Sequence, residues 1–110
     1  MKILPIPIKL LPHSISYAAY SGSERYGDSW ADPDSVDHVR VVPSSQVTAS
    51  NLSQQTDYSY LVIIDSVHTS PQITPTEKSK VDYGDLSLKI LKVNECWAEN
   101  KLHHWECECS

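Results

Sequence analysis

Apolar residues recur along this chain in short runs, and most of these runs have the length of a β-strand. The clearest covers residues 58–66, where Tyr, Leu, Val and Ile are followed by polar residues. In residues 13–20, Ile15 and Tyr17 alternate with polar neighbours, which places both on one face of a strand. Residues 36–43 are rich in valine and end at Pro43, which cannot continue a hydrogen-bonded ladder.

The last third of the chain predicts further strands. Residues 80–83 and 85–93 flank Gly84, and the Gly84-Asp85 pair favours a hairpin turn. Core positions follow this turn at Leu86, Leu88, Ile90 and Leu91. Residues 102–109 alternate between a buried face and a polar face. The buried face holds Trp105, Cys107 and Cys109, and the polar face holds His104, Glu106 and Glu108.

Long connections separate these strands. Residues 21–33 contain glycine, aspartate and proline and predict a loop or hairpin, whereas residues 67–79 contain two prolines and show no periodicity. A third connection is uncharged and long, so we expect it to be functional or disordered. It consists of Ser44, Ser45, Gln46, Val47, Thr48, Ala49, Ser50, Asn51, Leu52, Ser53, Gln54, Gln55 and Thr56. About six strands without an amphipathic helix predict an all-β fold, a small β-barrel or sandwich with long loops.

Residues 1–12 predict an extended N-terminal arm, followed by a single domain at residues 13–110. Pro5, Pro7 and Pro12 bias this stretch toward extended geometry rather than a helix. The same prolines, without a small-residue cleavage site, argue against a signal peptide, so we expect the chain to stay in the cytoplasm. The apolar side chains of the arm must cover either this domain or a neighbouring subunit. They are Ile3, Leu4, Ile6, Ile8, Leu10 and Leu11.

Charge and cysteine content exclude several classes of protein. The net charge of −5 and the scattered lysines argue against nucleic-acid binding, which depends on clustered Lys and Arg. The longest apolar runs are far shorter than the roughly twenty residues that span a bilayer. The cysteines number 3, so they cannot form a closed disulfide set within one chain, and we expect reduced thiols.

Histidine and cysteine gather near the end of the sequence, where they suggest zinc ligands. The candidates are Cys96, His103, His104, Cys107 and Cys109. On a strand, however, His103, Cys107 and Cys109 spread over about 20 Å, too far for one ion. The Cys-x-Cys pair also lacks the knuckle spacing of structural zinc sites. We therefore expect no metal or other cofactor, and a chain that folds without zinc.

The sequence carries no recognised catalytic motif. A Gly-x-Ser-x-Gly elbow is missing, and the 3 glycines do not form a phosphate-binding loop. Asp65, Ser66 and His68 are the nearest catalytic-type cluster, but a strand end followed by a polar turn explains them more simply. We expect that the protein is not an enzyme.

Two tryptophans are candidate partner contacts. Trp30 lies in a turn-rich connection, where it either caps one end of the barrel or contacts a partner. Trp97 is the second candidate. Together with Tyr26, both would suit a small β binding module for a glycan or peptide, which is an alternative class of function.

Two stretches near opposite ends of the chain resemble the minor capsid, or head-completion, proteins of phages and prophages of Gram-positive bacteria. Residues 5–17 begin Pro-Ile-Pro and end Leu-Leu-Pro-His-Ser-Ile-Ser-Tyr, similar to the family's Pro-rich start and its Leu-x-His-Ser-Val-x-Tyr. Residues 102–108, Leu-His-His-Trp-Glu-Cys-Glu, are similar to its terminal Leu-His-His-Trp-Glu-x-Glu. Between them, Asp37-x-x-Arg40-Val41, Ile64-Asp65 and Ser79-Lys80-Val81 follow the family's order. The chain departs from the family's Gly-Lys-x-Tyr after the turn, where it has Gly84-Asp85-Leu86-Ser87.

The resemblance implies a structural virion protein of the head-tail connector, a stopper with a small β-barrel fold. Such a subunit forms a homo-oligomeric ring, expected to be dodecameric, between the portal and adaptor above and the tail proteins below. It closes the channel through which packaged DNA passes without sequence-specific binding. The implied location is the neck of the virion, after assembly in the host bacterial cytoplasm. Residues 44–56 correspond to the connection that gates the channel in related stoppers, and the adaptor and tail-terminator roles stay open.

Overall fold

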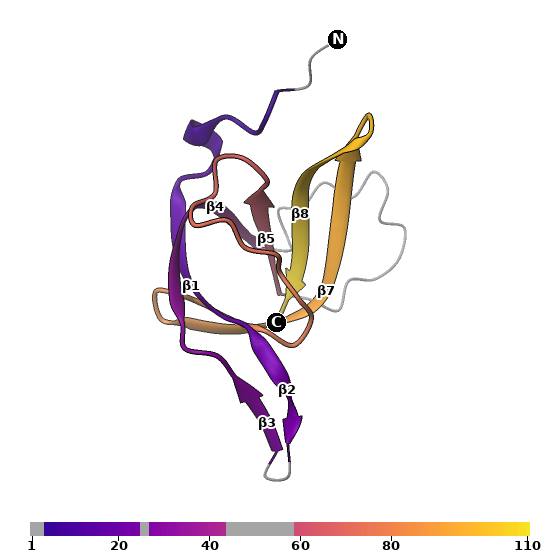
Figure 1. The fold of residues 1–110 in the computed structure, drawn as a ribbon. Helices are drawn as coiled ribbons and strands as arrows, with labels where there is room; N and C mark the ends of the chain where they lie inside the picture. The colour runs from indigo at the N-terminus through magenta and orange to yellow at the C-terminus, as the bar shows by residue number, and fades with distance from the viewer. Residues whose placement is uncertain (1–3, 25–26, 44–58) are drawn as a thin grey trace.

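The computed structural model describes residues 4–24, 27–43 and 59–110, and it shows a closed antiparallel β-barrel with a projecting hairpin (Figure 1). Six strands form the barrel: β1 (His13–Ala18), β4 (Asp34–Pro43), β5 (Tyr60–Asp65), β6 (Lys80–Tyr83), β7 (Leu86–Ala98) and β8 (Lys101–Cys109). The hairpin is a separate sheet of β2 (Tyr20–Glu24) and β3 (Gly27–Trp30). The predicted all-β class and small barrel are confirmed. The connection at residues 44–56, the expected channel gate, lies outside the described residues.

The barrel closes in the order β1-β4-β5-β8-β7-β6, and β6 pairs with β1 to complete the ring. All of these pairings are antiparallel. The long strand β7 makes closure possible because its first part pairs with β6 and its later part with β8. The register of β7 shifts between Ile90 and Lys92, where the strand passes from one neighbour to the other. Irregularities of this kind bend a strand and are common where sheets curl into barrels.

The core is built from inward residues of all six strands, and their period-two alternation is interrupted in β4 at His38, which has a φ of +61°. It contains Ile15, Tyr17, Val36, Val39, Val41, Val62, Ile64, Val81, Leu88, Ile90, Trp105, Cys107 and Cys109. The predicted inward faces of β1 and β8 are therefore confirmed. The expectation for Leu91 is wrong, because this side chain directly follows the buried Ile90, points to the opposite face and is exposed.

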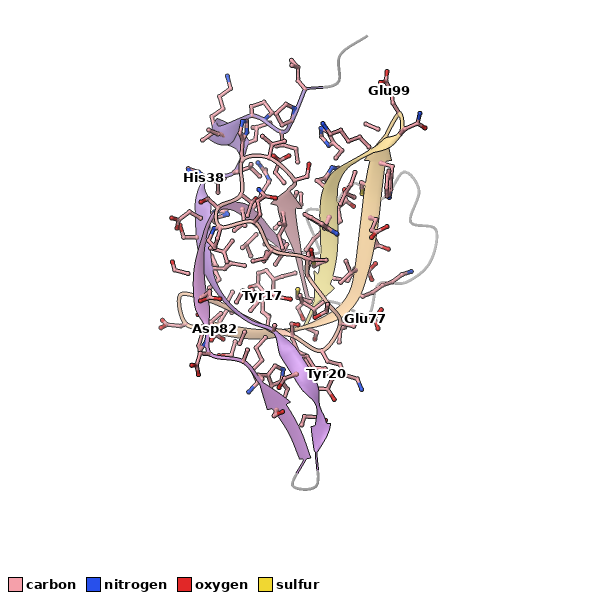
Figure 2. The ribbon with its side chains drawn as sticks, viewed as in Figure 1. Tyr17, Tyr20, His38, Glu77, Asp82 and Glu99 are labelled. Carbon is pink, nitrogen blue, oxygen red and sulfur yellow. The ribbon has the colours of Figure 1, made fainter. Side chains whose placement is uncertain are left out.

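Two tight turns connect strands in the second half of the chain. Tyr83 pairs with Leu86 across the predicted Gly84-Asp85 turn, and Gly84 has a φ of +58°, which favours glycine. Sequence patterning ended the next strand at residue 93, yet β7 continues to Ala98 and turns at Glu99, as Figure 2 shows. Residues 94–98 lack alternating apolar residues, so only pairing with β8 reveals their strand.

The connection between β5 and β6 packs on the barrel through Ser79, which is fully buried. Its hydroxyl lies 3.1 Å from the Tyr17 hydroxyl and accepts a 3.0 Å hydrogen bond from the Tyr20 backbone N–H. Thr76 joins both groups, through its own hydroxyl and its backbone N–H. This network fixes the base of the β2–β3 hairpin, with Tyr17 inside the barrel and Tyr20 on the hairpin (Figure 2).

The N-terminal arm is not extended throughout. A short 3₁₀ helix spans Ile8–Leu10, closed by the Leu10 N–H on the Pro7 carbonyl at 2.9 Å. Pro7 has a φ of −57°, which is compatible with the start of a helical turn. The prolines of the arm therefore allow a short helix, although the sequence predicted an extended segment. Leu11 then enters the domain with 1% of its surface exposed, so this residue of the arm packs on its own chain, one of the two possibilities that the sequence left open.

Candidate functional site: assembly surfaces

The backbone of the arm is hydrogen-bonded to one end of the barrel. The Ile6 N–H donates to Asp65 Oδ1 at 3.1 Å, and His68 Nδ1 lies 2.8 Å from the Ile6 carbonyl oxygen. His103 Nε2 lies 2.7 Å from the Leu4 carbonyl oxygen. Because carbonyl oxygens only accept, both histidines donate to the arm. The arm is therefore fixed in place by its main chain.

Asp65 organises this end of the barrel from a fully buried position at the end of β5. Besides Ile6, its carboxylate accepts hydrogen bonds from the backbone N–H groups of Val67 at 2.9 Å and His68 at 2.7 Å. A buried carboxylate is tolerated when backbone donors satisfy it, and such bonds are stronger than neutral ones. An acidic residue followed by a polar turn is the sequence signal for this arrangement, although it did not reveal the contact with the arm.

The side chains of the arm face away from these anchors. Leu4, Ile8 and Leu10 expose 70%, 49% and 45% of their surface, while Ile6 is half-buried. Ile3 lies outside the described residues. A backbone fixed to the barrel and apolar side chains facing outward together form a surface suited to a protein partner.

Trp30 lies at the base of the β2–β3 hairpin, where it packs against basic side chains. Its indole Nε1 donates to the Lys78 carbonyl oxygen at 2.7 Å, and its ring meets Tyr20 edge-on at 5.9 Å. The Lys80 ammonium lies 3.8 Å above the ring centroid and that of Lys89 lies at 5.5 Å. Such cation–π contacts stabilise the junction of hairpin and barrel. Its role as a partner contact stays a prediction.

Trp97 is the more open of the two candidate tryptophans. It projects from β7 with 59% of its surface exposed, and its Nε1 donates to Glu95 Oε1 at 3.3 Å. A large exposed aromatic side chain of this kind is typical of interface anchors. Trp30 contacts Lys78 and Tyr20 beside the β2–β3 hairpin, whereas Trp97 contacts Glu95 on β7. Among the described residues, the two tryptophans therefore share no hydrogen-bond or ring partner.

The Asp65, Ser66 and His68 cluster does not form a catalytic triad. The Ser66 hydroxyl donates to the carbonyl oxygens of Leu102 at 3.0 Å and His103 at 2.8 Å, while His68 bonds to the arm. A triad requires the serine to face the histidine base. These three side chains instead form structural contacts between β5, β8 and the arm.

The cysteines divide between two environments, and all are free thiols. Cys107 and Cys109 are buried in the core, and burial raises the pKa of both, that of Cys109 to about 12. Structural thiols enclosed in a core in this way are inert. Cys96 is half-buried on the outer surface of β7, opposite His104 on β8. Cys96, His104 and Glu106 therefore come together, whereas His103, Cys107 and Cys109 do not join them.

A small closed barrel with an anchored apolar arm defines the chain as a structural β-domain suited to assembly. Among the described residues, no helix is long and apolar enough to cross a membrane. The chain belongs to the minor capsid protein family, whose model matches residues 7–109. No curated protein matches the sequence. Membership confirms the resemblance found at the two ends of the sequence and identifies a phage structural protein of the virion that interacts with other virion proteins. A structural family of this kind favours a non-enzymatic role.

Proposed function

We propose that this minor capsid protein is the head-completion, or stopper, subunit of the head-tail connector. In this role it forms a ring in the neck of the virion, expected to share the dodecameric symmetry of the portal. The ring contacts portal or adaptor proteins on one side and tail proteins on the other, and it closes the DNA channel. The observation that carries the proposal is the apolar arm, because its outward side chains supply one half of a heterologous interface.

The arm suits such an interface because little conformational entropy is lost when it binds. Hydrogen bonds to Asp65 and from His68 and His103 already hold its backbone, so a neighbouring subunit meets a preformed surface. We assign Leu4, Ile8 and Leu10, with Ile3 and Ile6, to the contact between subunits. Trp30 and Trp97 are further candidate contacts with portal, adaptor or tail proteins.

The connection at residues 44–56 is our candidate for the channel gate. It joins β4 to β5, and the residues that flank it, Pro43 and Tyr60, are paired across the two strands. The two strands that it joins therefore meet at one end of the barrel, where Tyr60 also pairs with Cys109 on β8. Its uncharged sequence suits a channel through which DNA slides, since a basic loop would bind phosphate. The net charge of −5 acts in the same direction.

Two substitutions in the arm test the ring interface. We expect Ile8→Ser with Leu10→Ser to leave a folded monomer that no longer forms rings, because both side chains are exposed in the protomer. Unfolding free energy should change by less than about 0.5 kcal/mol per site, as at most surface positions. Leu91→Ser is the matched control, an exposed leucine outside the arm. Rings that survive the arm substitutions at wild-type concentration would contradict the assignment.

A phage that lacks the gene distinguishes the stopper from other neck components. Loss of a stopper should give heads that package DNA and then release it, together with finished tails that do not join. Loss of a tail terminator should instead give tails of abnormal length, and loss of an adaptor should leave purified stopper unable to bind heads. Stable, DNA-filled heads from the deletion phage would refute the stopper role.

A further inference from the structure

Three side chains with metal-binding atoms meet on the outer surface of the β7–β8 hairpin. Cys96 on β7 pairs directly with His104 on β8, and Glu106 lies two residues further along the same face. One ligand atom from each of the three falls within 4.8 Å of the others. His104 Nε2 and Glu106 Oε2 are already 3.0 Å apart.

We propose that Cys96, His104 and Glu106 form a binding site for Zn²⁺. Sulfur, imidazole and carboxylate are the three donor types that zinc takes in proteins. Tetrahedral zinc with ordinary bond lengths separates its ligand atoms by about 3.3–3.6 Å, so the cluster needs only small side-chain adjustments. A thiolate and a carboxylate together balance the charge of the cation. Water completes the fourth position on this exposed face.

The histidine contacts beside the cluster leave His104 Nε2 available for a cation. His103 Nε2 bonds to the Leu4 carbonyl at 2.7 Å, the two Nδ1 atoms of His103 and His104 lie 2.8 Å apart, and His104 Nε2 faces Glu106. Each of these three contacts needs a hydrogen, yet two neutral imidazole rings carry only two between them. With both rings neutral, His104 Nε2 therefore turns a lone pair toward Glu106, as a metal ligand would.

A metal ion satisfies this arrangement with both histidines neutral. His104 then binds through Nε2 and donates its Nδ1–H to His103, which in turn donates to the arm. Metal-bound histidines usually donate their second ring nitrogen to such a partner, and His103 takes this positioning role. The site would thus connect the β7–β8 hairpin to the arm through the hydrogen bond between His103 and the Leu4 carbonyl.

The thiol of Cys96 is protonated before the metal arrives. Burial, with the nearby Glu106 carboxylate as a second cause, raises its pKa to about 11. Zinc must therefore displace this proton, as at other cysteine sites. The expectation of a metal-free chain came from distances along a single strand, and this site takes its ligands from two strands instead. Folding without zinc is unaffected, because the core contains none of the three ligands.

Titration of the reduced, chelator-treated full-length protein with Zn²⁺ and Co²⁺ tests the proposal. We expect a single saturable Zn²⁺ per chain in calorimetry, with proton release that depends on the buffer. Co²⁺ should give a sulfur-to-metal charge-transfer band in the near ultraviolet. Cys96→Ser should abolish that band. Glu106→Gln should weaken Zn²⁺ binding by more than about 100-fold, because loss of a residue that only hydrogen-bonds to a ligand typically costs roughly 10–100-fold.

Matched variants separate the site from general effects. Glu108→Gln is the control, because this glutamate lies two residues from Glu106 on the same face and bonds to Asn94 at 2.9 Å. It should bind zinc as the wild type does, while circular dichroism shows every variant folded. His103→Ala should lower affinity by about 10–100-fold. Absence of saturable binding, an unchanged Co²⁺ spectrum in Cys96→Ser, or half a metal per chain would each overturn the proposal.

Discussion

Asp65→Asn tests whether one buried carboxylate holds both the arm and the turn after β5. The carboxylate accepts three backbone hydrogen bonds, from Ile6 on one oxygen and from Val67 and His68 on the other. An asparagine amide offers a single acceptor oxygen. If this oxygen keeps the two bonds of the turn, the amide nitrogen faces the Ile6 N–H, donor against donor, and the arm loses its anchor.

The magnitude follows from these contacts. Hydrogen bonds to a charged group contribute about 1.5–3 kcal/mol each, whereas neutral ones contribute about 0.5–1.5 kcal/mol. One bond is lost and two are weakened, and removal of a buried charge offsets part of this cost. We therefore expect the free energy of unfolding to fall by about 2–4 kcal/mol. In a domain of this size that corresponds to a fall in melting temperature of roughly 10–20 °C.

Urea unfolding at neutral pH, followed by circular dichroism, measures the change. Asp82→Asn is the control, since Asp82 is exposed on β6 and should be nearly neutral. In a chain without residues 1–6 the Asp65 substitution should cost less, by about 1 kcal/mol or more, because the Ile6 donor is gone. A loss below about 1 kcal/mol in the intact chain, or an equal loss without the arm, would refute the anchoring argument.

Three shorter predictions concern other regions. Shortening residues 44–56 to a tight turn should leave the barrel folded, since loop length has little effect on the entropy of loop closure. Capsids that carry the shortened protein should leak DNA before tail joining. Full retention of the packaged DNA would exclude this connection as the gate. Gly84→Ala should lower unfolding free energy by about 1 kcal/mol from backbone strain alone, because an added Cβ meets nothing within 4 Å, and an unchanged urea midpoint would contradict this. Burial raises the pKa of Cys109 from 9.0 to about 12 and that of Cys107 in the same direction, so the folded state holds these protons more tightly than the unfolded chain. The contribution of these two thiols to the free energy of unfolding should be fully present below pH 9.0 and should be lost as the pH rises toward 12. The slope of this loss should be shallower in Cys109→Ala. A urea midpoint that stays flat across this pH range would refute the prediction.

The sequence by itself determined the class of fold, the family resemblance and much of the core, because these depend on local patterns. Alternation placed Trp105, Cys107 and Cys109 on the inner face of β8, and the β-branched run at 36–43 became β4. Gly84 marked its hairpin because the turn requires a positive φ that glycine adopts freely. Leu91 was misplaced because it was counted with Leu86, Leu88 and Ile90, although it directly follows Ile90 and alternation therefore turns it to the opposite face.

Tertiary structure decided the features that depend on distant residues. The pairing of β1 with β6 closes the barrel, and Asp65 meets the arm 59 residues away in the chain. Spacing along one strand excluded zinc at Cys107 and Cys109, yet it carried no information about Cys96, which reaches Glu106 only across the β7–β8 ladder. Periodicity shows which face a side chain occupies, whereas strand order and register determine its neighbours, and these arise only when the whole sheet closes around its core.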